Sequence, residues 1–71
     1  MTDTELFQRF VVKKGLKYGY LARCLGISRA SLWMKINNTS EFKASEIAAL
    51  SELLNLTVYE RDAIFFASEV S

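Results

Sequence analysis

Hydrophobic side chains recur along the chain at intervals of three and four residues, and no segment shows the two-residue alternation of a strand. This pattern predicts an all-α fold with five short helices. Its 71 residues are enough for a single domain, spanning residues 1–71. The expected helices cover residues 3–14, 18–25, 29–37 and 44–54, and a fifth begins at Thr57.

Residues near the predicted helix ends support these boundaries. Thr2 and Glu5 have the spacing of a capping box at the start of the first helix, and Thr57 and Glu60 repeat that spacing in the fifth. Ser28 is suited to cap the third helix, because its hydroxyl can accept a hydrogen bond from a free backbone N–H. Three residues are expected to end helices because they tolerate a left-handed backbone or interrupt the apolar pattern: Gly15, Gly26 and Asn55.

One side of each predicted helix is apolar and is expected to face the core. The first two helices contribute Leu6, Phe7, Phe10 and Val11, then Leu21, Ala22 and Leu25. The third contributes Leu32 and Ile36, and the fourth contributes Ile47, Ala48, Leu50, Ser51 and Leu54. The fifth carries Val58, Ile64, Phe65 and Phe66.

Several residue types that common enzymes need are missing from the sequence. It contains no histidine and one cysteine, which argues against a zinc site and against cysteine–histidine catalysis. Its three glycines form no phosphate-binding loop. We therefore expect a protein that is not an enzyme and has no metal, cofactor or small-molecule ligand.

The cellular location is predicted from the absence of long apolar segments and from the cysteine content. No apolar run approaches the ~20 residues of a membrane-spanning helix, and we expect no membrane association. A single cysteine, Cys24, fits a reducing cytoplasm. Cys24 itself is expected to be a half-buried apolar residue and not a redox switch.

Charge is distributed unevenly, although the net charge is only +1. Residues 6–40 contain seven lysines and arginines and no acidic residue, whereas residues 41–71 contain two basic and six acidic residues. A chain with one basic half is suited to binding a polyanion through that half. A solvated charged surface would explain the charges alone equally well.

The segment LARCLGISRASLWMKINN, residues 21–38, contains most of a predicted helix-turn-helix motif. Such a motif needs a small residue where the helices cross, a residue that tolerates positive φ in the turn, and apolar residues that join the helices. Ala22, Gly26, Ile27 and Leu32 occupy these positions. At 100° per residue, Leu32 and Ile36 face the other helices, and five residues fall on the other side: Arg29, Ala30, Trp33, Met34 and Asn37.

At these residues the sequence resembles the Xre/Cro family of lambda-repressor-like DNA-binding domains, especially small phage-type regulators. The resemblance covers about residues 5–66 and includes GLKYGYLARCLGISRASLWMKINN, FKASEIAALSELLNLT and ERDAIFF. It implies a compact helical fold that binds operator DNA, usually as a dimer, with the second helix of the motif in the major groove. Tyr18 replaces a glutamine common in the family, and Asn38 replaces a glycine but tolerates the left-handed conformation.

Four outward residues of the third helix are candidates for reading bases. Arg29 is suited to a bidentate contact with guanine, and Ala30, Trp33 and Met34 are suited to contacts with thymine methyl groups. In the alternative interpretation, Arg29 contacts phosphate or solvent and Trp33 folds back over Phe42. Residues at the ends of the motif are expected, as in the family, to contact phosphates: Lys17, Tyr18, Ser28, Asn37, Asn38, Thr39 and Lys43.

The predicted function is sequence-specific binding of double-stranded DNA by a transcriptional regulator, expected to be a phage-type repressor in the cytoplasm, associated with the nucleoid. Adjacent Phe65 and Phe66 cannot both point inward, so one of them is expected to lie in a homodimer interface. A homodimer would bind a palindromic operator.

The alternative is a helical protein-interaction module, such as an anti-repressor that binds a related repressor. Two cations of the third helix, Arg29 and Lys35, favour DNA. Its Trp33 and Met34 would suit a protein hot spot equally well.

Overall fold

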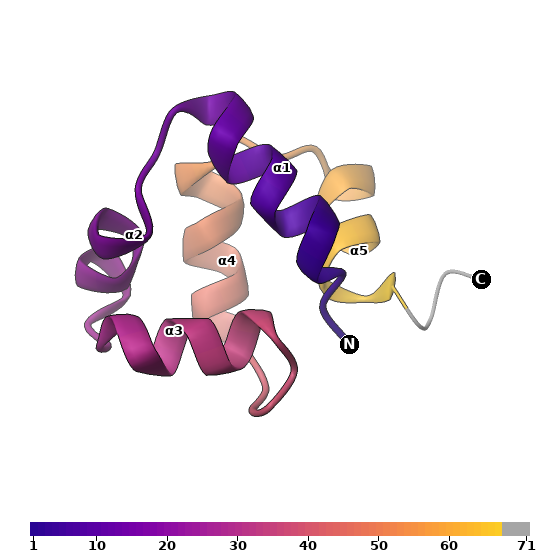
Figure 1. Cartoon of the computed structure of the whole chain (residues 1–71). Helices are drawn as coiled ribbons and strands as arrows, with labels where there is room; N and C mark the ends of the chain where they lie inside the picture. Colours follow the sequence, from indigo (N-terminus) through magenta and orange to yellow (C-terminus); the bar gives the residue numbers. More distant parts are fainter. Residues whose placement is uncertain (68–71) are drawn as a thin grey trace.

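Glycines and short polar residues divide residues 1–67, the part of the chain that the computed structural model describes, into five helices. These are α1 (Thr4–Lys14), α2 (Tyr18–Leu25), α3 (Arg29–Ile36), α4 (Ala44–Leu53) and α5 (Val58–Phe65). In Figure 1, α3 lies along the lower edge, α2 stands at its left end, and α1 crosses in front of α4 and α5. No strand occurs within the described residues, so the predicted all-α fold is confirmed.

Most helix ends lie within one residue of their predicted positions. Gly15 and Gly26 end α1 and α2 with φ of 70°. The Ser28 hydroxyl accepts a hydrogen bond from the Ser31 N–H at 3.0 Å and caps α3. Thr57 and Glu60 form the predicted capping box of α5.

The start of α1 differs from the prediction. Asp3, not Thr2, is the N-cap, and its carboxylate accepts a hydrogen bond from the Leu6 N–H at 3.0 Å. The capping box predicted for Thr2 and Glu5 is therefore wrong. Asp3 carries a negative charge that the positive end of the helix dipole favours, which a threonine does not offer.

The N-terminal residues connect the ends of two other helices. The Asn38 amide group accepts a hydrogen bond from the Thr2 N–H at 2.8 Å and donates one to the Thr2 carbonyl at 2.9 Å. The Thr4 hydroxyl donates to the Ile36 carbonyl at 2.7 Å, and the Asp3 N–H donates to the Ile64 carbonyl at 2.7 Å. Residues 2–4 therefore join the C-terminal end of α3 to the C-terminal end of α5, beside which the N-terminus lies in Figure 1.

The core takes side chains from all five helices. Its buried members are Phe7, Val11, Leu21, Ala22, Leu32, Ile36, Leu50, Leu54, Ile64 and Phe65. Phe42, from the loop before α4, packs between Phe7 and Phe65, with ring centroids 6.0 and 5.4 Å away. Two predicted core residues, Ala48 and Val58, are instead exposed, because the apolar sides of α4 and α5 are narrower than the sequence suggested.

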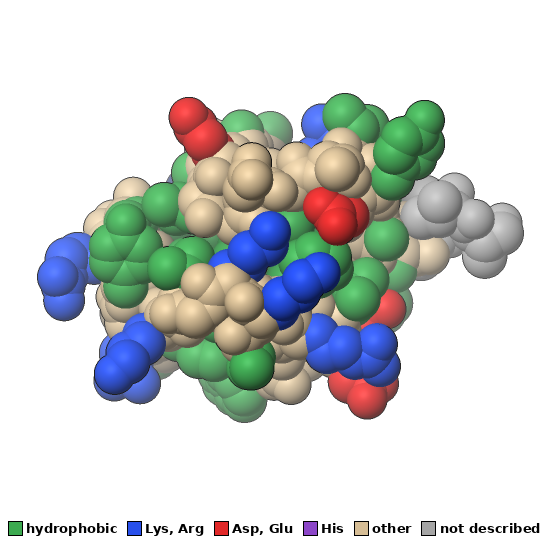
Figure 2. Space-filling model, turned by 90° about the horizontal axis from the view of Figure 1, so that it is seen from above, with side chains coloured by type: hydrophobic (Ala, Val, Ile, Leu, Met, Phe, Trp, Pro, Cys, Tyr) green, Lys and Arg blue, Asp and Glu red, His purple; other side chains and the backbone are tan. Residues whose placement is uncertain are grey.

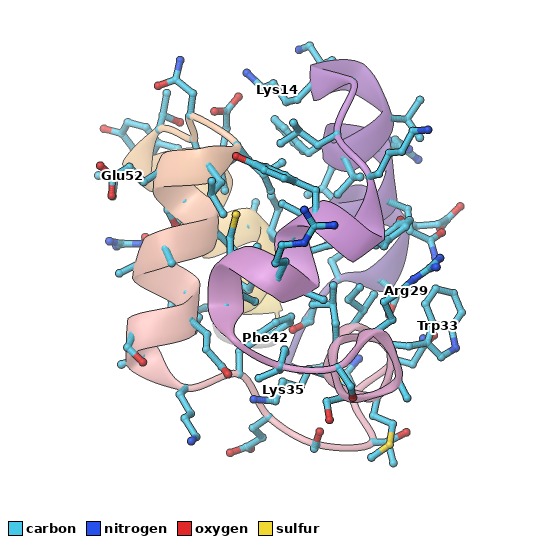
Figure 3. All side chains as sticks on the ribbon, turned by 90° about the vertical axis from the view of Figure 1, so that its left-hand side faces the viewer. Lys14, Arg29, Trp33, Lys35, Phe42 and Glu52 are labelled. Carbon is cyan, nitrogen blue, oxygen red and sulfur yellow. The ribbon has the colours of Figure 1, made fainter. Side chains whose placement is uncertain are left out.

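A buried ion pair links α3 to α4. Lys35 Nζ lies 2.6 and 2.7 Å from the two carboxylate oxygens of Glu46, and the side chains are only 11% and 8% exposed. Glu46 also accepts a hydrogen bond from the Lys43 N–H at 2.8 Å, at the start of α4. Figure 3 shows Lys35 leaving α3 on a different side from Trp33. Lys35 therefore does not belong to the outer face, and the prediction that it favours DNA is wrong.

The pKa of Glu46 results from opposing effects. Burial disfavours the charged carboxylate and by itself would raise the pKa. Hydrogen bonds from Lys35 and from the Lys43 backbone, together with the charges of both lysines, outweigh burial and hold the pKa below its usual 4.5. The ionised form is therefore the one that the fold stabilises.

We expect Lys35→Met to lower the free energy of unfolding by about 3 kcal/mol at pH 7, because it leaves a buried carboxylate without its cation. Chemical denaturation measures the loss. Asp62→Asn is the matched control, since the Arg61–Asp62 pair has side chains that are each 40% exposed. Its loss should stay below about 1 kcal/mol.

Acid should have a related effect on the unsubstituted protein. The stabilisation from ionised Glu46 is complete above pH 4.5 and is lost as the pH falls through the lower folded-state pKa. Glu46→Gln, which can still accept from the Lys43 N–H, should flatten this part of the profile. Equal acid sensitivity of the variant and the unsubstituted protein would contradict a role for Glu46.

Candidate nucleic-acid interface

The two sides of α3 have opposite environments. Leu32 and Ile36 are buried against the rest of the fold, whereas Arg29 and Ala30 are exposed. Trp33 is 52% exposed and Met34 is 44% exposed. The prediction that Trp33 lies outside the core is confirmed, and its contact with DNA remains a prediction.

The turn between α2 and α3 fixes the angle at which α3 leaves α2. Gly26 has a left-handed backbone, which lets the Ile27 N–H reach back to the Ala22 carbonyl at 3.0 Å. The Gly26 N–H donates to the Arg23 carbonyl at 3.1 Å. Ala22 is itself buried, so the small residue lies where the motif requires close approach of the two helices.

Arg29 lies against the first turn of α2. A Cβ placed on Gly19 would lie 3.7 Å from Arg29 Cδ and 3.8 Å from Arg29 Nε, which is ordinary van der Waals contact. Among residues 1–67, no hydrogen bond or ion pair engages the Arg29 guanidinium. The arginine stem is therefore supported while its charged end is available to a partner. Gly19 was missed as part of this site, although a glycine inside a helix was a detectable signal.

Trp33 packs against α2 and not against Phe42. Its ring meets the Tyr18 ring edge-on, with centroids 6.3 Å apart and planes at 89°. Figure 3 shows Arg29 and Trp33 on the same side of α3, with Phe42 inside the molecule. Burial raises the pKa of Tyr18 above its usual 10.0, so its hydroxyl keeps the proton and can donate a hydrogen bond.

Three of the predicted phosphate-contacting side chains already have partners within the protein. Both ends of the Asn38 amide bind the Thr2 backbone, which leaves one amide N–H, and a phosphate contact by this side chain stays a prediction. The predicted left-handed backbone of Asn38 is confirmed with φ of 66°. The Ser28 hydroxyl is bonded to the Ser31 N–H and hydroxyl. Asn37 donates one amide N–H to the Trp33 carbonyl at 2.9 Å, which leaves its second amide N–H to donate to a further partner.

The other predicted phosphate contacts lie at the two ends of the motif. Lys17 is exposed at the N-cap of α2, and Tyr18 follows it. Thr39 and Lys43 are exposed in the segment between α3 and α4. Two of these side chains therefore lie at the start of the motif, and two follow its end.

The basic residues of segment 6–40 do not form one surface. Lys35 is paired with Glu46, and Lys14 lies at the top of the molecule in Figure 3, away from Arg29 at mid-height. Figure 2 looks down on the top of the molecule and shows lysine and arginine side chains there as well. Lys13 Nζ lies 5.6 Å from the centre of the Phe10 ring. The binding surface must therefore be judged from residues around α3 and not from the charge of the whole segment.

Two other predicted side chains lie elsewhere than expected. Cys24 is exposed and not half-buried, because α2 directs Leu21 and Ala22 to the core and turns Cys24 away. Phe65 packs edge-on against Phe7 in the core, which removes it from any interface. Phe66 is half-buried at the surface, so the interface prediction continues only for this residue.

Comparison of the chain with protein-family models, with curated proteins and with solved structures found no match. In the part of the chain that the structure describes, no helix has the length and apolar character to cross a membrane. The same residues contain no cluster of histidine, cysteine and acidic side chains that could hold a metal ion.

We expect Trp33→Ala to lower the free energy of unfolding by only about 1 kcal/mol, because half of the side chain already meets solvent. Phe7→Ala, which removes a fully buried aromatic ring, should cost about 3–5 kcal/mol under the same conditions. Emission from Trp33, the single tryptophan, should be that of a solvent-exposed indole. Blue-shifted emission with a large loss of stability in Trp33→Ala would place the ring in the core.

Proposed function

We propose that the protein is a transcriptional regulator that binds double-stranded DNA in a sequence-specific manner, with α3 in the major groove. The observation that carries the proposal is the availability of the Arg29 guanidinium at the N-terminal end of an exposed helix face. A guanidinium offers two parallel donors to the O6 and N7 atoms of guanine. The resemblance to Xre/Cro domains supports the same role, that of a phage-type repressor acting in the cytoplasm on nucleoid DNA.

The side chains around α3 suit the two requirements of such a complex. The major groove of B-DNA is about 12 Å wide and admits one α-helix. Lys17 and Tyr18 at the start of the motif, with Thr39 and Lys43 after its end, would contact the phosphates that border the groove. Arg29, Ala30, Trp33 and Met34 would then face the base edges.

A homodimer is the second part of the proposal. Between α4 and α5 the surface has a hollow of about 490 Å³, lined by Phe42, Ala44, Ile47, Ala48, Arg61 and Phe66. Exposed Ala48 and half-buried Phe66 give this surface the apolar character of an interface core. A two-fold arrangement would place two α3 helices about 34 Å apart, on successive turns of a palindromic operator.

One observation favours the alternative, a helical protein-interaction module such as an anti-repressor. Because Lys35 is held by Glu46, Arg29 is the single cation among the outward α3 residues Arg29, Ala30, Trp33, Met34 and Asn37. An arginine beside an exposed tryptophan is also the composition of a protein hot spot. We prefer DNA because exposed lysines, Lys17 and Lys43, lie at both ends of the motif.

Selection from random duplex DNA should enrich one palindromic sequence. Arg29→Ala should then lose about 1–3 kcal/mol of operator affinity and relax the preference at one base pair in each half-site. Lys17→Ala should weaken binding to all sequences alike and reduce the slope of log affinity against log salt by about 0.9. Titrations by fluorescence anisotropy measure both effects.

Failure to bind any duplex DNA at low salt would refute the proposal and favour the protein-interaction module. Equal effects of Arg29→Ala on operator and on unrelated DNA would restrict Arg29 to phosphate contact.

We expect the protein to sediment as a dimer at micromolar concentration. Ala48→Arg should yield a monomer, because a long charged side chain would fill the apolar hollow without disturbing the core. Val58→Arg is the matched control, since Val58 is exposed on α5 but does not line the hollow. A monomer that binds a full operator with one protein per duplex would contradict the dimer.

A further inference from the structure

A second hollow lies on the outer side of the helix-turn-helix, beside Arg29. Its volume is about 340 Å³, and its lining residues are Tyr18, Arg29, Ala30, Leu32, Trp33 and Ile36. Most of this wall is carbon, because aliphatic and aromatic side chains surround the arginine stem. A surface that binds a polyanion is expected to be polar and basic, so an apolar recess on it is unexpected. Such a recess suits an apolar group of the bound partner.

We propose that this hollow receives the C5-methyl group of a pyrimidine that adjoins the guanine contacted by Arg29. The inference rests on the proposed function and names what the same surface recognises. Phosphates and most base edges carry donors and acceptors, and placing these against a carbon wall without partners is unfavourable. The C5-methyl group of thymine is the apolar group that unmodified DNA presents in the major groove.

The position of the hollow restricts which pyrimidine it can reach. Arg29 forms one wall, so a group inside the hollow lies next to the arginine that contacts guanine. Successive bases of one strand are about 3.4 Å apart along the helix axis. The methyl group therefore belongs to the base pair that neighbours the guanine, not to one further along the site.

The walls of the hollow are held in place before DNA arrives. Gly19 leaves room for the Arg29 stem, because a Cβ at this position would lie 3.7 Å from Arg29 Cδ, and Trp33 meets Tyr18 edge-on at 6.3 Å. Leu32 and Ile36 at its base belong to the core and cannot move independently. A preformed recess loses little side-chain entropy on binding, so a single methyl group can contribute most of its transfer free energy.

Two bases supply this chemistry. Thymine carries the C5-methyl group in ordinary DNA, and 5-methylcytosine carries the same group in modified DNA. These bases differ at position 4 of the ring, whereas the apolar walls of the hollow suit the methyl group that they share. We therefore assign the hollow to the methyl group, and the experiment separates the two sources.

The test uses the selected operator and the intact protein. Each thymine is replaced in turn by deoxyuridine, which lacks only the methyl group. One replacement per half-site, next to the guanine assigned by Arg29→Ala, should weaken binding about fourfold, the effect of ~0.8 kcal/mol for one buried methyl(ene) group. At the same position, 5-methylcytosine should bind about fourfold more tightly than cytosine.

Variants connect the effect to this hollow. Trp33→Ala removes one wall and should bring the ratio of thymine to deoxyuridine affinity close to one. Met34→Ala is the matched control, because Met34 is exposed on the same helix but does not line the hollow. It should retain the fourfold ratio at that position even if total affinity falls.

The outcomes separate this inference from the proposed function. A penalty for deoxyuridine without a gain for 5-methylcytosine supports the hollow and assigns it to thymine. Tight operator binding with no penalty at any thymine overturns the inference and leaves the proposed function standing. The same conclusion follows if Trp33→Ala keeps the fourfold ratio of thymine to deoxyuridine affinity. Absence of duplex binding overturns both.

Discussion

The pairing of Lys35 with Glu46 determines which side of α3 can face a partner. Any rotation of α3 about its axis would separate Lys35 from a carboxylate that is 8% exposed and would leave a buried charge without its cation. The same carboxylate accepts from the Lys43 N–H, so the start of α4 and the rotation of α3 are fixed by one group. The exposure of Arg29 and Trp33 and the shape of the hollow beside them follow from this constraint.

Three separate restraints hold a helix of only eight residues. The left-handed Gly26 sets its beginning, Glu46 sets its rotation, and the N-terminal segment holds its end through Thr4 and Asn38. A short helix has little intrinsic stability, because it forms too few hydrogen bonds to offset the conformational entropy lost in forming its first turn. The surrounding fold therefore supplies the rigidity that the proposed recognition of DNA would require.

Local patterns in the sequence were sufficient for the five helices, for the buried positions of Leu32 and Ile36, and for the outward position of Trp33. These patterns failed where a side chain's ion-pair or hydrogen-bond partner within the protein lies far along the chain. Lys35 looked like a surface cation because Glu46 follows eleven residues later, beyond a loop. Asn38 looked free of partners within the protein because Thr2, to which it hydrogen-bonds, is 36 residues away. The adjacent phenylalanines could be separated only once Phe42 had placed Phe65 in the core.

The side chains proposed to choose the partner are not those that hold the fold together. Arg29, Ala30 and Met34 are exposed, and no hydrogen bond or ion pair within residues 1–67 engages their side chains. Substitutions at these positions can therefore accumulate in related sequences while the five-helix framework persists. Asn38 is equally exposed but lacks this freedom. Its amide hydrogen-bonds to the Thr2 backbone and so links the segment before α1 to the end of α3. Divergence of such sequences should spare Asn38 and concentrate on the outer face of α3.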